Sequence, residues 1–333
     1  MKKSTRRMAL LVAAWSAVAL GVRSAGATEP VVEFLDGLRG RGLFDVADMY
    51  LENLRSNTTI PAEIKATIPY EQGRTLVESS KTQRDINTRL KELGRGREMF
   101  QEFITKNSQH PLLGSAQLQL GNVMVEEARA YLEKSKQPAS NENADELLAK
   151  AKDLFAQAVK TFDDATNEFD AKRKSFPKYI DPKETALIAA RDQSVIDYIQ
   201  SMIFAGVAVN ESSKAFPEGS KERNDTLKLA ADRFHKVYVD WRRLYAGLYA
   251  GMLEARCLQE MGDVKRALGI YDELLAQPDA GPAFQNLKAK VLRLALEAWM
   301  LPDQKKYEEV STRGEAWLKD ARPDLERSPE GLA

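Results

Sequence analysis

The segment from Tyr245 to Pro278, YAGLYAGMLEARCLQEMGDVKRALGIYDELLAQP, constrains the fold more than any other part of this chain. Its small and apolar residues recur with helical spacing on both sides of Gly262, which indicates two short helices joined by a tight turn. Ala255 and Ala267 are small enough to let these helices approach closely. One such hairpin cannot bury its own apolar face, so the pattern predicts further hairpins stacked against it.

The same anchors recur elsewhere in the sequence, as expected for an internal repeat. In FLDGLRGRGLFDVADMYLENL, the step from Leu35 to Ala47 equals the twelve-residue step from Ala255 to Ala267. A degenerate last copy runs from Ala298 to Trp317. Further second helices are expected where a Gly or Ala precedes a Phe by one turn, at Gly96 and Phe100, Ala151 and Phe155, and Ala230 and Phe234.

These motifs resemble the tetratricopeptide repeat family, in which a small residue in the first helix is followed by A-x3-F and then Pro in the second. The resemblance implies an all-α fold, an α-solenoid of irregular hairpins over residues 28–333. The second-helix anchors at 47, 96, 151, 230, 267 and 310 are separated by 49, 55, 79, 37 and 43 residues, whereas the family repeats every ~34. The units are therefore expected to be divergent or to carry insertions. An irregular helical bundle is the alternative.

Residues 1–27 have the pattern of a secretory signal peptide. Four basic residues precede an apolar run from Met8 to Val22, and Ala25 and Ala27 supply the small residues of a cleavage site. The run is shorter than the roughly 20 residues that span a bilayer. We therefore expect cleavage after Ala27, export to the periplasm or cell envelope, and no transmembrane segment afterwards. An uncleaved anchor is the alternative, and the sequence leaves the export route open.

The charge balance argues against nucleic acid as a partner. Residues 1–27 hold five of the 49 basic residues and no acidic ones, so the exported chain has 44 Lys plus Arg against 49 Asp plus Glu, or about −5. Binding to nucleic acid relies on a basic face. The single Cys257 cannot form an intramolecular disulfide and, among apolar neighbours, is interpreted as a core residue.

The sequence contains no constellation typical of catalysis. Its two histidines, His110 and His235, lie outside any metal-binding motif. No G-x-S-x-G, Walker or dinucleotide-binding motif is present. We therefore expect no catalytic residues, no cofactor and no metal.

One segment predicts an unusually long helix. From Asn141 to Phe176, apolar residues recur every three or four positions, at 144, 147, 151, 154, 158, 162, 165 and 169. This is close to a coiled-coil seam. The helix is either a projecting arm for a partner helix or an ordinary solenoid helix packed on its neighbours.

Stacked helical hairpins commonly present a concave surface to another macromolecule, so we expect a non-catalytic scaffold that binds a protein partner. Some tetratricopeptide proteins clamp a C-terminal carboxylate with Lys and Asn, but Met252 and Leu253 stand at those positions, which argues against clamping here. The resemblance implies that first-helix residues line the groove. These candidates are Tyr249, Met252, Arg256 and Gln259 in the clearest hairpin and Asp36 and Arg39 in the first.

Two other classes of function remain open. The helical array could be the platform of a larger envelope enzyme, for example in glycan processing, or a structural envelope protein that self-assembles. Ser328, Pro329 and Glu330 have the pattern of a helix start. We therefore expect the natural protein to continue beyond Ala333 or to be truncated there. A catalytic motif in that extension would favour the enzyme platform.

Overall fold

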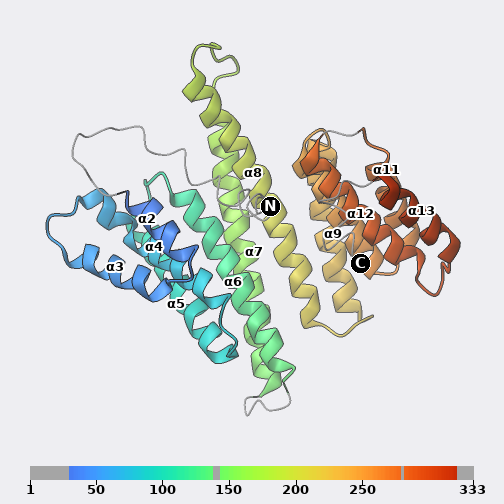
Figure 1. The fold of residues 1–333 in the computed structure, drawn as a ribbon, viewed down its shortest axis with the longest axis horizontal. Coiled ribbons are helices and arrows are strands. Elements are labelled where there is room, and N and C mark those ends of the chain that lie inside the picture. Colours follow the sequence, from blue (N-terminus) through green and yellow to red (C-terminus); the bar gives the residue numbers. More distant parts are fainter. Residues whose placement is uncertain (1–29, 138–142, 279–280, 321–333) are drawn as a thin grey trace. The chain divides into compact units, whose positions relative to one another are not determined.

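The computed structural model describes residues 30–137, 143–278 and 281–320. The predicted signal peptide and the helix start expected at Ser328 lie outside these ranges. The described residues form helices joined by turns and contain no strand (Figure 1). The α-helices are α2 (Val31–Arg39), α3 (Phe44–Ser56), α4 (Ala62–Ser80), α5 (Ile86–Lys106), α6 (Leu113–Ser135), α7 (Ala144–Ser175), α8 (Thr185–Ser212), α9 (Lys221–Trp241), α10 (Tyr245–Glu260), α11 (Val264–Leu275), α12 (Pro282–Trp299) and α13 (Tyr307–Asp320), and the short 3-10 helix η1 (Ser213–Ala215) follows α8.

Consecutive helices pair as hairpins, which confirms the prediction of an all-α, solenoid-like fold. Even-numbered helices are the first members of the pairs, and odd-numbered helices are the second members. Every predicted second-helix anchor falls in a second helix: Ala47 in α3, Gly96 in α5, Ala151 in α7, Ala230 in α9, Ala267 in α11 and Val310 in α13. The four alanines are fully buried because they occupy the contacts between helices.

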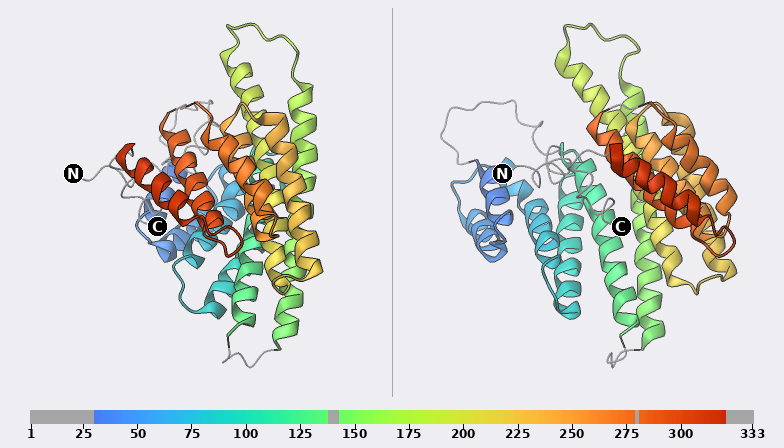
Figure 2. Two further views of the ribbon diagram at one scale, coloured as in Figure 1. Left: turned by 90° about the vertical axis from the view of Figure 1, so that its right-hand side faces the viewer. Right: turned by 45° about the vertical axis from the view of Figure 1, so that its right-hand side comes forward.

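A compact unit spans Leu38–Pro278. Within it, first helices of successive hairpins also contact one another, in the pairs α4 with α6, α6 with α8, and α8 with α10. Figure 2 shows α4 to α11 following one another across this unit. The first helices therefore form one layer within this unit.

In several first helices, a glycine receives an aromatic ring. An ideal Cβ built at Gly121 of α6 would lie 2.5 Å from the Phe162 ring of α7, and Phe162 is buried. The missing side chain lets the helices approach at a position where glycine otherwise weakens a helix. The same contact joins Gly73 to Phe100, Gly206 to Phe234 and Gly251 to Tyr238.

Buried glutamates connect successive hairpins within this unit. Each lies in a first helix and pairs with a cation or a histidine from the preceding hairpin: Glu71 with Arg39 (2.7 Å), Glu127 with Arg97 (2.9 Å), Glu211 with Arg129 (2.9 Å) and Glu254 with His235 Nδ1 (3.1 Å). Because an unpaired buried charge is costly, these pairs favour one register of each hairpin against the next.

The environments of these glutamates shift their pKa values in different directions. Burial raises the pKa of Glu127 and of Glu254, against the opposing effect of Arg97 and His235. Burial also opposes the ionisation of Glu211, but hydrogen bonds from Arg129 and Lys214 outweigh it and lower the Glu211 pKa.

The predicted long helix is α7, which begins after Asn143, whose side chain accepts a hydrogen bond from the Asp145 amide. Its apolar seam is buried from Leu147 to Phe169, and α7 packs against α6 and α8. The end of α7 and the start of α8 extend beyond neighbouring helices (Figures 1 and 2). Most of α7 is thus an ordinary packed helix, and only its end projects.

Outside the Leu38–Pro278 unit, α12 and α13 form the last hairpin, where the degenerate copy was predicted. Ala298 is buried in α12, but Leu301 follows the end of that helix. The Arg313 guanidinium of α13 lies 4.3 Å over the ring of Trp299. No helix in the described ranges combines the length and apolarity needed to cross a membrane.

Candidate partner-binding surface

The strongest candidate surface lies on α10, the first helix of the hairpin that dominates the sequence pattern. Tyr245 and Tyr249, one turn apart, stack with ring centroids 6.4 Å apart and planes inclined by 9°. Tyr245 is 47% exposed, and Tyr249 is half-buried. Burial raises the pKa of both phenols, so both are neutral at neutral pH and can donate a hydrogen bond.

Arg256 continues this face two turns after Tyr249. Its side chain is 47% exposed, and its Nε donates to Glu260 Oε1 at 3.2 Å. An exposed ion pair of this kind contributes little stability, so a partner carboxylate can compete for the guanidinium. The Arg256 charge also acts on Tyr249, where it opposes the rise in pKa caused by burial.

Gln259 is on the same helix but is occupied within the hairpin. Its Oε1 accepts a hydrogen bond from the Tyr271 hydroxyl of α11 at 2.9 Å, and Tyr271 is fully buried. Gln259 therefore fixes the second helix against the first. Its half-buried side chain leaves less for a partner to contact than Arg256 does.

Two of the predicted surface residues are core residues. Met252 is 6% exposed because α10 packs against α8, α9 and α11 and leaves only a narrow stripe uncovered. Arg39 is buried at the end of α2, where Nη2 lies 2.7 Å from Glu71 and Nε donates to Thr75 Oγ1 at 3.1 Å. The expectation that these two side chains line a surface groove was wrong.

Asp36 is exposed on α2. The structure thus places three of the predicted residues together on α10, namely Tyr249, Arg256 and Gln259.

Cys257 and His110 have structural roles in this fold. Burial raises the pKa of Cys257 to about 12, so it is a protonated thiol at neutral pH, as its interpretation as a core residue requires. His110 stacks edge-on against Phe103, and its Nδ1 accepts the Leu112 amide at 3.1 Å. Burial lowers the His110 pKa. Within the described part of the chain, no group of three His, Cys, Asp or Glu residues is placed to hold a metal.

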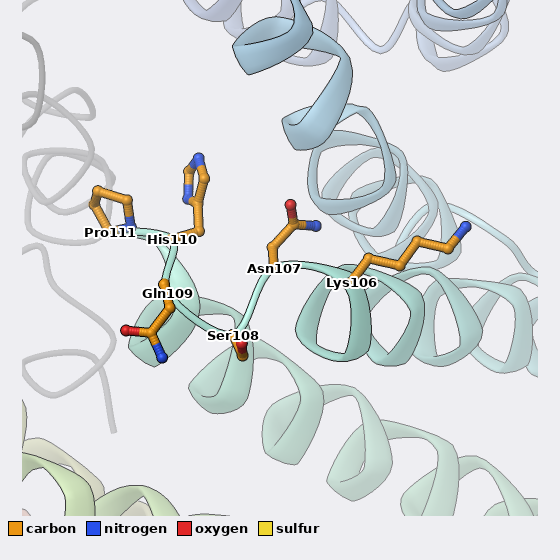
Figure 3. A pocket seen from close by; sticks show the side chains of 6 residues that line it. All are labelled: Lys106, Asn107, Ser108, Gln109, His110 and Pro111. Carbon is orange, nitrogen blue, oxygen red and sulfur yellow. The ribbon is translucent and has the colours of Figure 1, made fainter.

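A surface hollow of about 430 Å³ lies at the turn between α5 and α6 and is lined by residues 106–111. Figure 3 shows the side chains of Lys106, Gln109 and His110 pointing away from one another. Ligand sites have polar groups that converge on a common point. The arrangement of this turn lacks that convergence.

The turn before α10 also belongs to this surface, although it was not predicted from the sequence. Arg242, Arg243 and Leu244 are exposed there, directly before Tyr245. The sequence WRRLY, residues 241–245, indicates such a surface, because Trp, Arg and Tyr are enriched at interface hot spots.

Comparison with known proteins adds no assignment. No protein-family model matches the chain, and a search of curated proteins found no matching sequence.

Proposed function

We propose that this protein is a non-catalytic scaffold of the bacterial periplasm or cell envelope that binds a protein partner on its first-helix layer. The observation that carries the proposal is the α10 face, where two stacked tyrosines and an exposed arginine lie on one helix of the first-helix layer. Tyr and Arg are among the residues most often found at interface hot spots. The layer of first helices offers a broad surface to a partner, and Tyr245, Tyr249 and Arg256 are the side chains that we expect to contact it.

We further propose that the array belongs with the tetratricopeptide repeats. The resemblance rests on the spacing of Ala255, Ala267 and Pro278. Close helix packing supports the proposal, because a glycine of a first helix contacts an aromatic ring of a neighbouring helix at Gly73, Gly121, Gly206 and Gly251. The proposal of export is supported by the basic, apolar and A-x-A pattern of residues 1–27. N-terminal sequencing of the exported protein tests it, and a chain that starts at Met1 would contradict cleavage.

Site-specific photocrosslinking tests the binding surface directly. A photoreactive phenylalanine derivative replaces Tyr249 in one variant and Lys265, exposed on the second helix α11, in the control. In intact envelopes, we expect a defined protein adduct from position 249 and not from position 265. Identical adducts from both positions, or none from position 249, would contradict the proposal.

The crosslinked partner then allows a quantitative test. The purified partner should bind the Tyr249→Ala, Arg256→Ala double variant about thirtyfold more weakly or worse, because loss of a hot-spot residue costs at least ~2 kcal/mol. Far-ultraviolet circular dichroism should show unchanged helicity in the variant. Turnover of a substrate by the purified chain would contradict the scaffold function and show that the protein is an enzyme.

A further inference from the structure

The turn between α9 and α10 carries two adjacent arginines. Arg242 and Arg243 are both exposed. Within the part of the chain that the structure describes, neither guanidinium has a hydrogen bond or an ion pair. Most other arginines in the described ranges are paired, as Arg97, Arg129 and Arg233 are. These two guanidinium groups are therefore available to an external acceptor.

Backbone hydrogen bonds and one close backbone approach hold the turn that carries them. The Leu244 amide donates to the Trp241 carbonyl at 2.8 Å, and the Gly247 amide donates to Leu244 at 3.1 Å. A Cβ at Gly247 would lie 2.2 Å from the Trp241 carbonyl oxygen, so only glycine fits this close approach. A surface that is ordered before binding loses less conformational entropy when a partner docks.

Aromatic contacts tie the turn to the preceding hairpin as well. The Trp241 ring packs edge-on against Tyr198 of α8, with centroids 6.4 Å apart. The Arg173 guanidinium of α7 lies 4.3 Å from the centre of the Tyr198 ring on its face. The turn is therefore supported by three helices, α7, α8 and α9.

The turn is continuous with the α10 face. Leu244 and Tyr245 are each nearly half exposed, and Tyr245 stacks on Tyr249. We call Arg242, Arg243, Tyr245, Tyr249 and Arg256 the arginine–tyrosine surface. It has arginines at both ends and aromatic rings between them.

We propose that the arginine–tyrosine surface binds an acidic protein segment, with carboxylates on Arg242 and Arg243 and an apolar side chain on the paired tyrosines. This inference rests on the proposed scaffold function and names the chemistry of the partner. The planar guanidinium accommodates a carboxylate through two parallel hydrogen bonds. Asp240 is the only acidic residue between 239 and 253, so this stretch keeps a positive charge.

A protein segment fits these observations better than nucleic acid or an anionic membrane does. Both of those carry dense negative charge and are held by broad basic faces. The exported chain has a net charge of about −5, with 44 basic against 49 acidic residues. The positive charge here is local and lies beside exposed Leu244 and Tyr245, as in protein interfaces where Arg and Tyr surround an apolar contact.

Selection from a library of random displayed peptides on the purified protein tests the proposal. We expect the selected peptides to be enriched in Asp and Glu beside an apolar or aromatic residue. By fluorescence anisotropy, a selected peptide should bind the R242Q/R243Q variant about tenfold more weakly or worse, because charge-assisted hydrogen bonds are lost. The matched control is R84Q/R95Q, which removes two exposed arginines of the α4–α5 turn and α5 and should leave binding unchanged.

The outcomes separate this inference from the proposed function. Selected peptides without acidic enrichment, or equal binding by R242Q/R243Q, would overturn the acidic-segment proposal. If the selected peptides lacked acidic residues but still required Tyr249 for binding, the scaffold function would stand and only the acidic-segment proposal would fail. If no peptide were selected and the protein bound phosphatidylglycerol vesicles through Arg242 and Arg243, the ligand would be a membrane surface and not a protein segment.

Discussion

Replacing Gly121 with alanine tests whether the glycine and aromatic contacts hold the hairpins together. A Cβ at this position would lie 2.5 Å from Cε1 and Cζ of Phe162. The ring cannot easily move, because it is buried and packs against Phe204 with centroids 5.6 Å apart. Overpacking of this kind costs about 1–3 kcal/mol, whereas alanine gains about 1 kcal/mol over glycine in helix propensity.

The control is Gly269→Ala, in the exposed part of α11, where a Cβ would meet nothing within 4 Å. It gains the propensity without the clash. We therefore expect Gly121→Ala to be less stable than Gly269→Ala by about 1–3 kcal/mol in urea denaturation followed by circular dichroism. Phe162→Leu should cost less in the Gly121→Ala background than in the natural protein, because the two residues are coupled. Equal stabilisation by both alanines would show that the ring has room and would refute the argument.

Four further predictions concern the buried polar groups. Arg39→Ala should lower the free energy of unfolding by about 3 kcal/mol in urea denaturation, because it removes a buried partner of Glu71; an unchanged midpoint would contradict the buried pair. Glu211→Gln should destabilise the protein at neutral pH, and the difference should disappear as pH falls through the lowered folded pKa, because a lowered carboxyl pKa contributes stability only above it. Glu127→Gln should have the opposite pH dependence: its raised folded pKa favours the native state at acidic pH and this contribution is lost as pH rises through it, so glutamine should flatten the urea-derived stability profile on the acidic side of neutrality. Cys257 should react with a thiol reagent at neutral pH only after urea unfolding, since burial raises its pKa to about 12; fast labelling of the native protein would contradict its burial.

The hairpins could be predicted from the sequence because their anchors are local. Ala47, Ala151, Ala230 and Ala267 each lie one turn before an apolar or aromatic residue of the same helix, and helical periodicity alone places both on one face. The same reasoning located α7 within a few residues of its observed start. Such patterns do not depend on which other helices cover the element.

Exposure on the first helices could not be predicted in the same way. Met252 and Arg256 both follow Tyr249 with helical spacing, but α8, α9 and α11 cover one of them and leave the other. Arg39 resembles an ordinary surface arginine until Glu71, thirty-two residues later, is brought against it. Burial of this kind depends on contacts between separate hairpins, which a periodic pattern within one helix does not encode.

The contact at Gly251 differs from the other glycine contacts in its direction. Gly73, Gly121 and Gly206 receive a ring from the second helix of their own hairpin, whereas Gly251 receives Tyr238 from the hairpin before it. The Gly251 contact therefore joins the α8–α9 hairpin to the α10–α11 hairpin. A larger residue at Gly251 would therefore strain the junction between two hairpins, whereas the same change at Gly121 strains the packing within one hairpin.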